Sequence, residues 1–140
     1  MAETFPFKLV SPTGIVYEGP VEQATAIGSN GEFGVLPNHV DFITSLSPGV
    51  VTLKLADGSV TEYLLTGGLT EVKDGAMTAL ADEAIPVAAV DPVSAAPEVQ
   101  EAEQRLAQMS FYDPGYHAAQ VALQISQARA DISNRRRTSG

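Results

Sequence analysis

The composition of the chain changes abruptly between residues 88 and 97, and this change constrains the fold more than any other feature of the sequence. Before it, Val, Thr and Leu recur in short runs punctuated by Gly; after it, Ala, Gln and Glu dominate. β-branched residues between turn residues are typical of strands, whereas Ala, Gln and Glu favour helices. The sequence therefore predicts a strand-rich domain over residues 1–88 and a linker with helices over residues 89–140.

Turn signals separate the short apolar or alternating runs of the first domain. Residues 51–55 and 60–65 flank Asp57-Gly58, the strongest short-range hairpin signal, and Lys73-Asp74-Gly75 predicts a second hairpin. Several left-handed backbone positions are expected in Gly28-Ser29-Asn30-Gly31. About ten short strands in under ninety residues leave no room for crossover helices. We therefore expect an antiparallel β-sandwich of about ten strands.

The second domain carries two apolar stripes at helical spacing, separated by Asp113-Pro114-Gly115. The first stripe consists of Val99, Ala102, Leu106 and Met109, and the second of Ala118, Val121, Ala122, Ile125, Ala128 and Ile132. A short connection between two such helices predicts an antiparallel helical hairpin. Because the stripes contain mostly Ala, the helices bury little apolar area against each other, and we expect the hairpin to be only marginally stable alone.

Charge and composition exclude several functional classes. The chain has 44% hydrophobic residues, no Cys and no Trp, and a net charge of -9, as expected for a globular protein that repels nucleic acid and anionic lipid. Residues 1–91 hold twelve carboxylates against three lysines, which suits a basic protein partner. We find neither a signal peptide nor a run of about 18 apolar residues, so we expect a cytosolic protein that reaches a membrane only through another protein.

The residues that could carry chemistry do not form a recognisable catalytic or metal-binding pattern. His39 and His117 lie on different predicted domains, without the spacing that holds a metal. No Gly-x-Ser-x-Gly elbow occurs, and the Gly67-Gly68 pair precedes a strand rather than a helix, so we interpret it as a turn or bulge. We therefore expect no catalytic residue, no metal and no cofactor.

The densest local signal is Gly31-Glu32-Phe33-Gly34-Val35-Leu36-Pro37-Asn38-His39. Two glycines, a proline and several apolar side chains within nine residues predict a rigid, shaped segment. One interpretation is a turn framework that only sets strand register, and local physics alone favours it. The other is a docking segment that presents Glu32 and Phe33 outward.

This segment, with the downstream Thr44 and Pro48-Gly49-Val50, resembles the epsilon subunit of F-type ATP synthases, called delta in mitochondria. The resemblance extends to residues 7–12, to Gly67-Gly68 and to the helical hairpin. It implies a ten-stranded sandwich followed by two antiparallel helices. It also implies a non-catalytic rotor subunit of a proton-translocating enzyme, held at the cytoplasmic face of the bacterial inner membrane through the complex.

The resemblance implies partners for the sandwich. Residues Gly31, Glu32, Phe33 and Gly34 would contact the ring of c subunits, with Glu32 facing the polar loops of the ring. His39 would lie near the contact with the ring or with the gamma subunit. Rotation driven by protons would then pass through the sandwich to the catalytic sites.

The resemblance also implies that the hairpin acts as a brake, extending along gamma to reach acidic loops of the catalytic beta subunits. Arg135, Arg136 and Arg137 fit that contact, although a solvated basic tail at the negative helix end explains them as well. Some members bind ATP on this hairpin. Here Asp91 is present, but Ser94 replaces the expected Arg, which argues against ATP binding.

Two other classes remain open from the residues alone. A stand-alone binding module would use the sandwich to capture a carbohydrate or peptide, but nine aromatic residues without Trp offer a poor platform. A small hydrolase would use His39, Asp41 and a bound metal.

Overall fold

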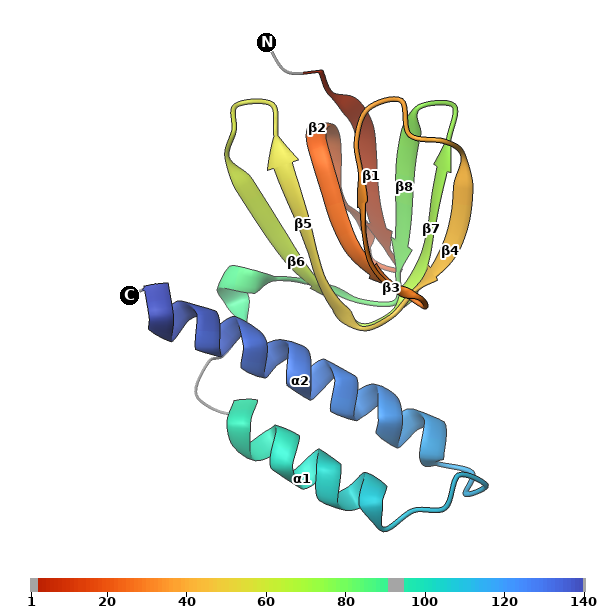
Figure 1. Cartoon of the computed structure of the whole chain (residues 1–140), viewed down its shortest axis with the longest axis vertical. Coiled ribbons are helices and arrows are strands. Elements are labelled where there is room, and N and C mark those ends of the chain that lie inside the picture. The colour runs from red at the N-terminus through yellow and green to blue at the C-terminus, as the bar shows by residue number, and fades with distance from the viewer. Residues whose placement is uncertain (1–2, 91–94, 140) are drawn as a thin grey trace. The chain divides into compact units, whose positions relative to one another are not determined.

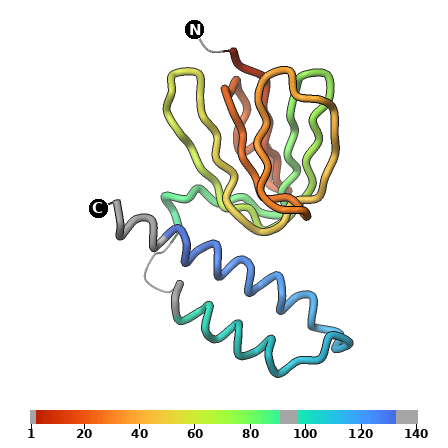
Figure 2. The backbone as a smooth tube through the Cα atoms, viewed as in Figure 1, coloured from red at the N-terminus to blue at the C-terminus, as the bar shows by residue number. Residues whose placement is uncertain are grey.

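The computed structural model describes residues 3–90 and 95–139, with side chains described for 3–90 and 97–132. The chain divides into two compact units, Met1–Pro86 and Val87–Gly140, each considered by itself. Figure 2 traces the backbone through the strands of the first unit and the two helices of the second.

The first unit contains nine strands among its described residues (Figure 1). They are β1 (Phe5–Ser11), β2 (Gly14–Gly28), β3 (Gly31–Val35), β4 (Phe42–Leu46), β5 (Gly49–Leu55), β6 (Val60–Leu65), β7 (Gly68–Lys73), β8 (Ala76–Ala81) and β9 (Ala84–Pro86). The predicted sandwich is thus confirmed, with nine strands rather than ten.

The 15-residue strand β2 connects the layers of the sandwich. The strands follow the order β1-β8-β7-β4-β2-β5-β6-β9, with β3 beside β2 and a further pairing of β1 with β2. The first part of β2 pairs with β1, and its second part pairs with β3, β4 and β5. One strand therefore carries hydrogen bonds to four others.

One strand pair departs from the antiparallel pattern that the sequence predicts. β1 and β8 are parallel, with Phe7 opposite Met77 and Val10 opposite Leu80. The six strands between them in the chain supply the long connection that a parallel pair needs, so no crossover helix is required. Local sequence signals do not reveal such a long-range pairing.

The core of the sandwich comes from the inward-facing residues of both layers. Its largest fully buried side chains include Phe7, Leu9, Leu53, Met77 and Val35. On β5, Val51 and Leu53 are buried while Lys54 is exposed, as the alternating sequence predicts.

The two predicted hairpins are confirmed. β5 and β6 join through Asp57-Gly58, where Gly58 has φ +86°, and β7 and β8 join through Asp74 and Gly75, with φ of 52° and 80°. Two successive positive φ values match the twist of a two-residue hairpin. The expectation of several left-handed positions in residues 28–31 was wrong, because Gly31 alone has a positive φ there.

The Gly67-Gly68 turn joins β6 and β7, as interpreted from the sequence. Both residues have strongly positive φ, +134° and +145°. A Cβ added to Gly68 would collide with the carbonyl oxygen of Leu80. Both the conformation and the close approach of the neighbouring strand therefore require glycine at Gly68.

The second unit begins with a short 3-10 turn (Val87–Ala89) and continues with helices α1 (Ala95–Ala107) and α2 (Tyr116–Ser139). The helices pack together, and Arg129 Nη1 lies 3.4 Å from Glu98 Oε2 across the pair. Ala102 is buried in α1, as its stripe predicts, but Ala118 at the start of α2 is exposed. None of the described helices is both long and apolar enough to span a membrane.

Candidate docking surface

Alternation along β3 sends its side chains to opposite faces. Val35 is buried in the core and Phe33, on the same face, is half-buried against it. Glu32 and Gly34 therefore point outward, and both are exposed. Glu32 lies opposite Ile27 of β2, and this strand pairing fixes the backbone from which its side chain projects.

The face that carries Glu32 is mostly polar, although Ile27, opposite Glu32, and Val60, opposite Lys54, also belong to it. Its β5 neighbours belong to hydrogen-bonded or ion-paired groups: Thr52 Oγ1 donates to Glu62 Oε2 at 2.9 Å, and Lys54 Nζ lies 3.4 Å from Glu22 Oε2. Gly34 leaves a gap in this face, because a Cβ placed on it would meet Gln23 only at an ordinary contact distance of 3.5 Å. Unlike Gly31, with φ +113°, Gly34 is not needed for its backbone conformation.

The loop that follows β3 is held by its own hydrogen bonds. The backbone N–H of His39 donates to the carbonyl oxygen of Leu36 at 3.2 Å. Asn38 has φ +68°, and its side-chain amide donates to Glu3 Oε2 at 3.3 Å. These bonds give the loop one shape, as the sequence predicts for this segment.

His39 lies within a row of aromatic rings. Its Nδ1–H donates to the carbonyl oxygen of Val40 at 2.7 Å, which orients the ring. The imidazole centre is 5.1 Å from the ring of Phe42, which meets Phe33 edge to face at 5.4 Å. We call His39, Phe42 and Phe33 the aromatic row. Glu32 and His39 thus belong to two different faces, although the sequence places them in one segment.

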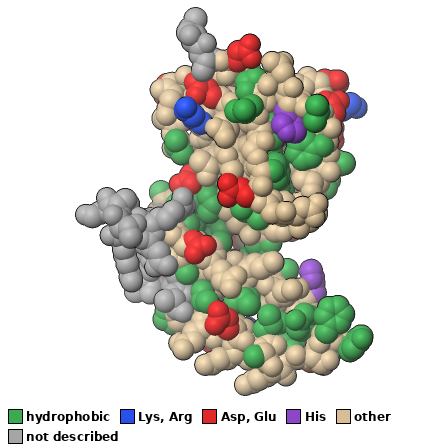
Figure 3. Space-filling view, viewed as in Figure 1, with side chains coloured by type: hydrophobic (Ala, Val, Ile, Leu, Met, Phe, Trp, Pro, Cys, Tyr) green, Lys and Arg blue, Asp and Glu red, His purple; other side chains and the backbone are tan. Residues whose placement is uncertain are grey.

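Exposed apolar side chains lie close in sequence to the members of the aromatic row, and sequence reasoning missed them. Leu36, Val40 and Ile43 are 56%, 75% and 62% exposed. Figure 3 shows hydrophobic side chains gathered beside the histidine of the sandwich. Ile43 lies on the outer face of β4, between the half-buried Phe42 and Thr44, and this alternation was the only usable signal.

The apolar surface continues across the outer face of β7 and β8. Leu69 and Leu80 are opposite each other and both are exposed, and Leu80 pairs in turn with Val10 of β1. Large exposed apolar patches on soluble proteins mark contacts with other molecules. This outer face is therefore a second candidate surface.

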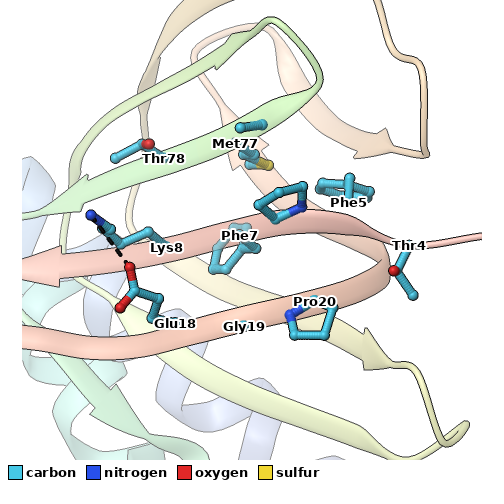
Figure 4. Close-up of a pocket in the computed structure, with 11 residues that line it drawn as sticks. Thr4, Phe5, Phe7, Lys8, Glu18, Gly19, Pro20, Met77 and Thr78 are labelled. Carbon is cyan, nitrogen blue, oxygen red and sulfur yellow. Dashed lines mark ion pairs between the residues drawn. The ribbon is translucent and has the colours of Figure 1, made fainter.

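A shallow groove of about 480 Å³ lies along β1, β2 and β8 (Figure 4). Pro6, Pro20 and Met77 are among the apolar residues that line it, and the ion pair between Lys8 and Glu18, 3.4 Å apart, is also part of its lining. The two charges compensate each other.

The remaining candidate residues do not converge. Asp41 Oδ1 accepts the backbone N–H of Asp74 at 3.1 Å, and His117 is exposed on the helical unit. The described residues contain no group of three or more His, Asp or Glu side chains that could hold a metal. Asp91 and Ser94 lie outside the described residues, and so do the side chains of Arg135, Arg136 and Arg137.

Among the residues that the structure describes, two groups, both outside the 31–39 segment, have clearly shifted pKa values. Hydrogen bonds from the Ser59 hydroxyl and backbone N–H lower the pKa of Asp57 in the β5–β6 turn. Burial raises the pKa of Tyr17, and Tyr63 and Asp57 add to that effect.

Comparisons with known proteins cover both units. The family model described as "ATP synthase, Delta/Epsilon chain, beta-sandwich domain" matches residues 4–87. An ATP synthase epsilon chain of Maricaulis maris is 39% identical over 104 residues, which cover 74% of this chain and 77% of the relative. An ATP synthase epsilon chain of Desulfitobacterium hafniense is 39% identical over 133 residues, covering 95% of this chain and 98% of the relative.

Solved structures show the same fold. A chain of the Euglena gracilis mitochondrial ATP synthase matches with a TM-score of 0.78 and 24% identity, covering 89% of this chain and 78% of that one. A chain of the Tetrahymena thermophila mitochondrial ATP synthase matches with a TM-score of 0.57 and 13% identity, covering 96% of each chain.

Proposed function

Because the chain belongs to the ATP synthase epsilon-chain family, called delta in mitochondria, we propose that its sandwich joins two parts of a rotor through two different faces. An epsilon chain is a non-catalytic subunit of the central stalk of an F-type ATP synthase. The polar face with Glu32 would meet the c-ring. The aromatic row and its apolar surroundings would meet the gamma subunit.

The observation that carries the proposal is a similarity that extends over the whole chain: the Desulfitobacterium relative aligns with 95% of it. A tagged copy of the chain, expressed in its own cells, should co-purify with a membrane-bound ATPase that contains gamma and c subunits. Recovery of a free chain, with no effect on ATP hydrolysis or synthesis, would contradict the proposal. A carbohydrate or peptide recovered instead would favour the stand-alone binding module.

Glu32 supports the contact with the c-ring through its exposure and its fixed backbone. Because β3 is already paired with β2, binding through Glu32 orders only the side chain and not the backbone. The excess of acids in residues 1–91 would also steer the sandwich toward a basic partner.

Two substitutions test this contact without altering the core. Glu32→Gln should weaken rebinding to an epsilon-depleted enzyme about two- to fivefold, as expected for an exposed ion pair of about 0.5–1 kcal/mol. Gly34→Ala should leave the sandwich folded but place a methyl group on the same face, and should also weaken rebinding. Glu83→Gln, which changes an exposed carboxylate outside the segment, is the matched control. Equal rebinding of all three variants would exclude this face.

The exposed apolar side chains next to the aromatic row in the sequence support the contact with gamma, because apolar side chains that remain in solvent gain most from burial against a partner. Val40→Ala and Ile43→Ala should each weaken binding of an isolated gamma subunit, and they should leave the stability of the free sandwich nearly unchanged. Val60→Ala, at an apolar residue of β6 that is 59% exposed, provides the control. Unchanged binding of gamma by both variants would contradict this assignment.

The helical hairpin would restrain ATP hydrolysis by contacting the catalytic beta subunits, with Arg135, Arg136 and Arg137 as candidate partners for their carboxylates. A chain that ends near Asp91 should still join the complex, because the sandwich has its own core, and hydrolysis should be equal or faster. A truncated chain that no longer assembles would contradict this division of roles. The complex would hold the chain at the cytoplasmic face of the inner membrane.

A further inference from the structure

The turn of the helical hairpin carries an exposed group of aromatic rings that the proposed function does not use. Phe111 and Tyr112 are 74% and 90% exposed. The ring of Phe111 lies 5.6 Å from Tyr112, edge to face, and 5.6 Å from Tyr116. We call Phe111, Tyr112 and Tyr116 the aromatic tip. Hydrophobic side chains gather at this end of the helical unit in Figure 3.

Hydrogen bonds hold the tip in one shape. The Ser110 N–H donates to Asp113 Oδ2 at 2.8 Å, and the Asp113 N–H donates back to the Ser110 carbonyl at 2.9 Å. The Tyr116 N–H donates to the Asp113 carbonyl at 3.0 Å, so the start of α2 is tied to the same turn. Because the backbone of the turn is already ordered, binding through the rings costs only the rotamer freedom of their side chains.

The exposed rings contribute little to packing within the hairpin. The stripe that joins the two helices runs through Ala102 and Ala128, which are buried. Phe111 and Tyr112 precede α2 and remain in solvent. Large aromatic side chains are costly to leave exposed, and they are enriched where proteins bind one another.

Charge decides which partner suits the tip. Between Arg105 and Arg129 the only fully charged side chain in the sequence is Asp113, and it is exposed beside the rings. The faces of aromatic rings carry a negative electrostatic potential and attract cations, most often the planar guanidinium of Arg. The tip thus offers ring faces and a carboxylate together.

We propose that the aromatic tip binds an arginine-bearing segment of a protein partner, with a guanidinium group stacked on the rings and paired with Asp113. A second copy of this chain is a poor partner, because it would bring the same carboxylate and a net charge of -9. An anionic membrane would repel this end of the hairpin, which has no flanking Lys or Arg.

The full chain can be titrated with a short Ala-based peptide that carries several arginines, and with otherwise identical peptides that carry Gln or Lys instead. Amide NMR shifts should concentrate on residues 109–117 with the Arg peptide. The Lys peptide should bind more weakly than the Arg peptide, and the Gln peptide should not bind. Shifts spread over the acidic sandwich, or equal binding of the Gln peptide, would overturn the proposal.

Variants separate the tip from general charge attraction. The double variant Phe111→Ala/Tyr112→Ala should bind the Arg peptide about tenfold more weakly, since each exposed cation–ring contact contributes about 0.5–1 kcal/mol. Asp113→Asn keeps an oxygen for the Ser110 N–H but removes the charge, and should weaken binding severalfold. Ile15→Ala/Val60→Ala, two side chains each 59% exposed on the sandwich, should change nothing. Equal weakening by this control pair would overturn the proposal.

Vesicles and self-association provide the remaining outcomes. Anionic or neutral phospholipid vesicles should not shift the NMR resonances of the aromatic tip. In sedimentation experiments, the native chain and the Phe111→Ala/Tyr112→Ala variant should have the same apparent mass at every protein concentration. Vesicle binding through the tip would identify a lipid surface as the occupant. Dimerisation through the tip would identify a second copy, and either result would replace the proposal.

Discussion

The backbone conformation and the space around single glycines determine which of them the sandwich can replace with a larger residue. Gly31 and Gly34 look equivalent in the sequence, yet only Gly31 has a positive φ, and a Cβ on Gly34 would have room. Gly58 and Gly68 differ in another way: both have a positive φ, but Gly58 lies in an open turn, whereas Gly68 lies against the backbone of β8. Glycines required by the fold are therefore distinct from glycines that shape a surface.

Gly68→Ala should destabilise the sandwich by more than about 3 kcal/mol, because the added Cβ meets a carbonyl oxygen as well as an unfavourable φ. Gly58→Ala is the control. It has a positive φ but nothing within 4 Å of the new Cβ, so it should cost about 1–2 kcal/mol. Urea unfolding of both variants measures the difference, and equal losses would contradict the steric explanation.

Asp57 links stability to acidity. The Ser59 hydroxyl, and to a smaller extent the Ser59 N–H, lower the pKa of Asp57 in the folded chain. The contribution of Asp57 to folding stability is therefore complete above the usual carboxyl pKa of 3.8, and it is lost as the pH falls through the lower pKa of the folded state. Ser59→Ala, which removes the larger cause, should be less stable than the native chain at pH 6. The difference should shrink below pH 3.8. Urea unfolding midpoints of both chains, measured between pH 6 and below pH 3.8, test this prediction. A difference between the two midpoints that grows as the pH falls would contradict it.

The elements show which parts of the structure local signals can predict. Asp-Gly pairs between alternating runs predicted both hairpins, and stripes at helical spacing predicted both helices, because turn chemistry and periodicity are local. The parallel closure of β1 on β8 depends on residues about seventy positions apart and has no local signal. The exposure of Val40 and Ile43 was missed for a similar reason, since it depends on which sheet face stays uncovered.

The helical hairpin should be sensitive to volume at its seam. Ala102 is buried where α1 packs on α2, so Ala102→Leu should cost about 1–3 kcal/mol of hairpin stability through overpacking. Ala107→Leu, at an exposed end of α1, is the control and should be neutral. Hydrogen exchange should speed up in α1 and α2 of the first variant only, with sandwich amides unchanged. Equal exchange in both variants would show that the seam tolerates the larger side chain.

At the scale of the whole molecule, the two units differ in charge as well as in structure. The twelve carboxylates of residues 1–91 against three lysines contrast with five acids and five arginines in residues 92–140. The family match covers residues 4–87, and the alignment with the Desulfitobacterium relative covers 95% of the chain, so the sandwich and the hairpin belong to one protein with two kinds of surface.

A fragment of residues 1–86 should fold alone, because the cluster of buried residues that forms the sandwich core lies within it. Its urea midpoint, followed by strand circular dichroism, should match that of the sandwich transition in the full chain. A fragment that stays unfolded would show that the core depends on residues beyond Pro86.

The four partners of β2 determine how the sandwich responds to a pulling force. A load applied along β2 is shared at the same time by its ladders with β1, β3 and β5 and by its single pairing with β4, where Gly28 lies opposite Leu46. Hydrogen bonds loaded together along their strands rupture as a group, whereas an edge strand peels away one bond after another. In a single-molecule pulling experiment, the sandwich should therefore unfold in one step. Below the force of that step, it should also deform little when it is twisted repeatedly.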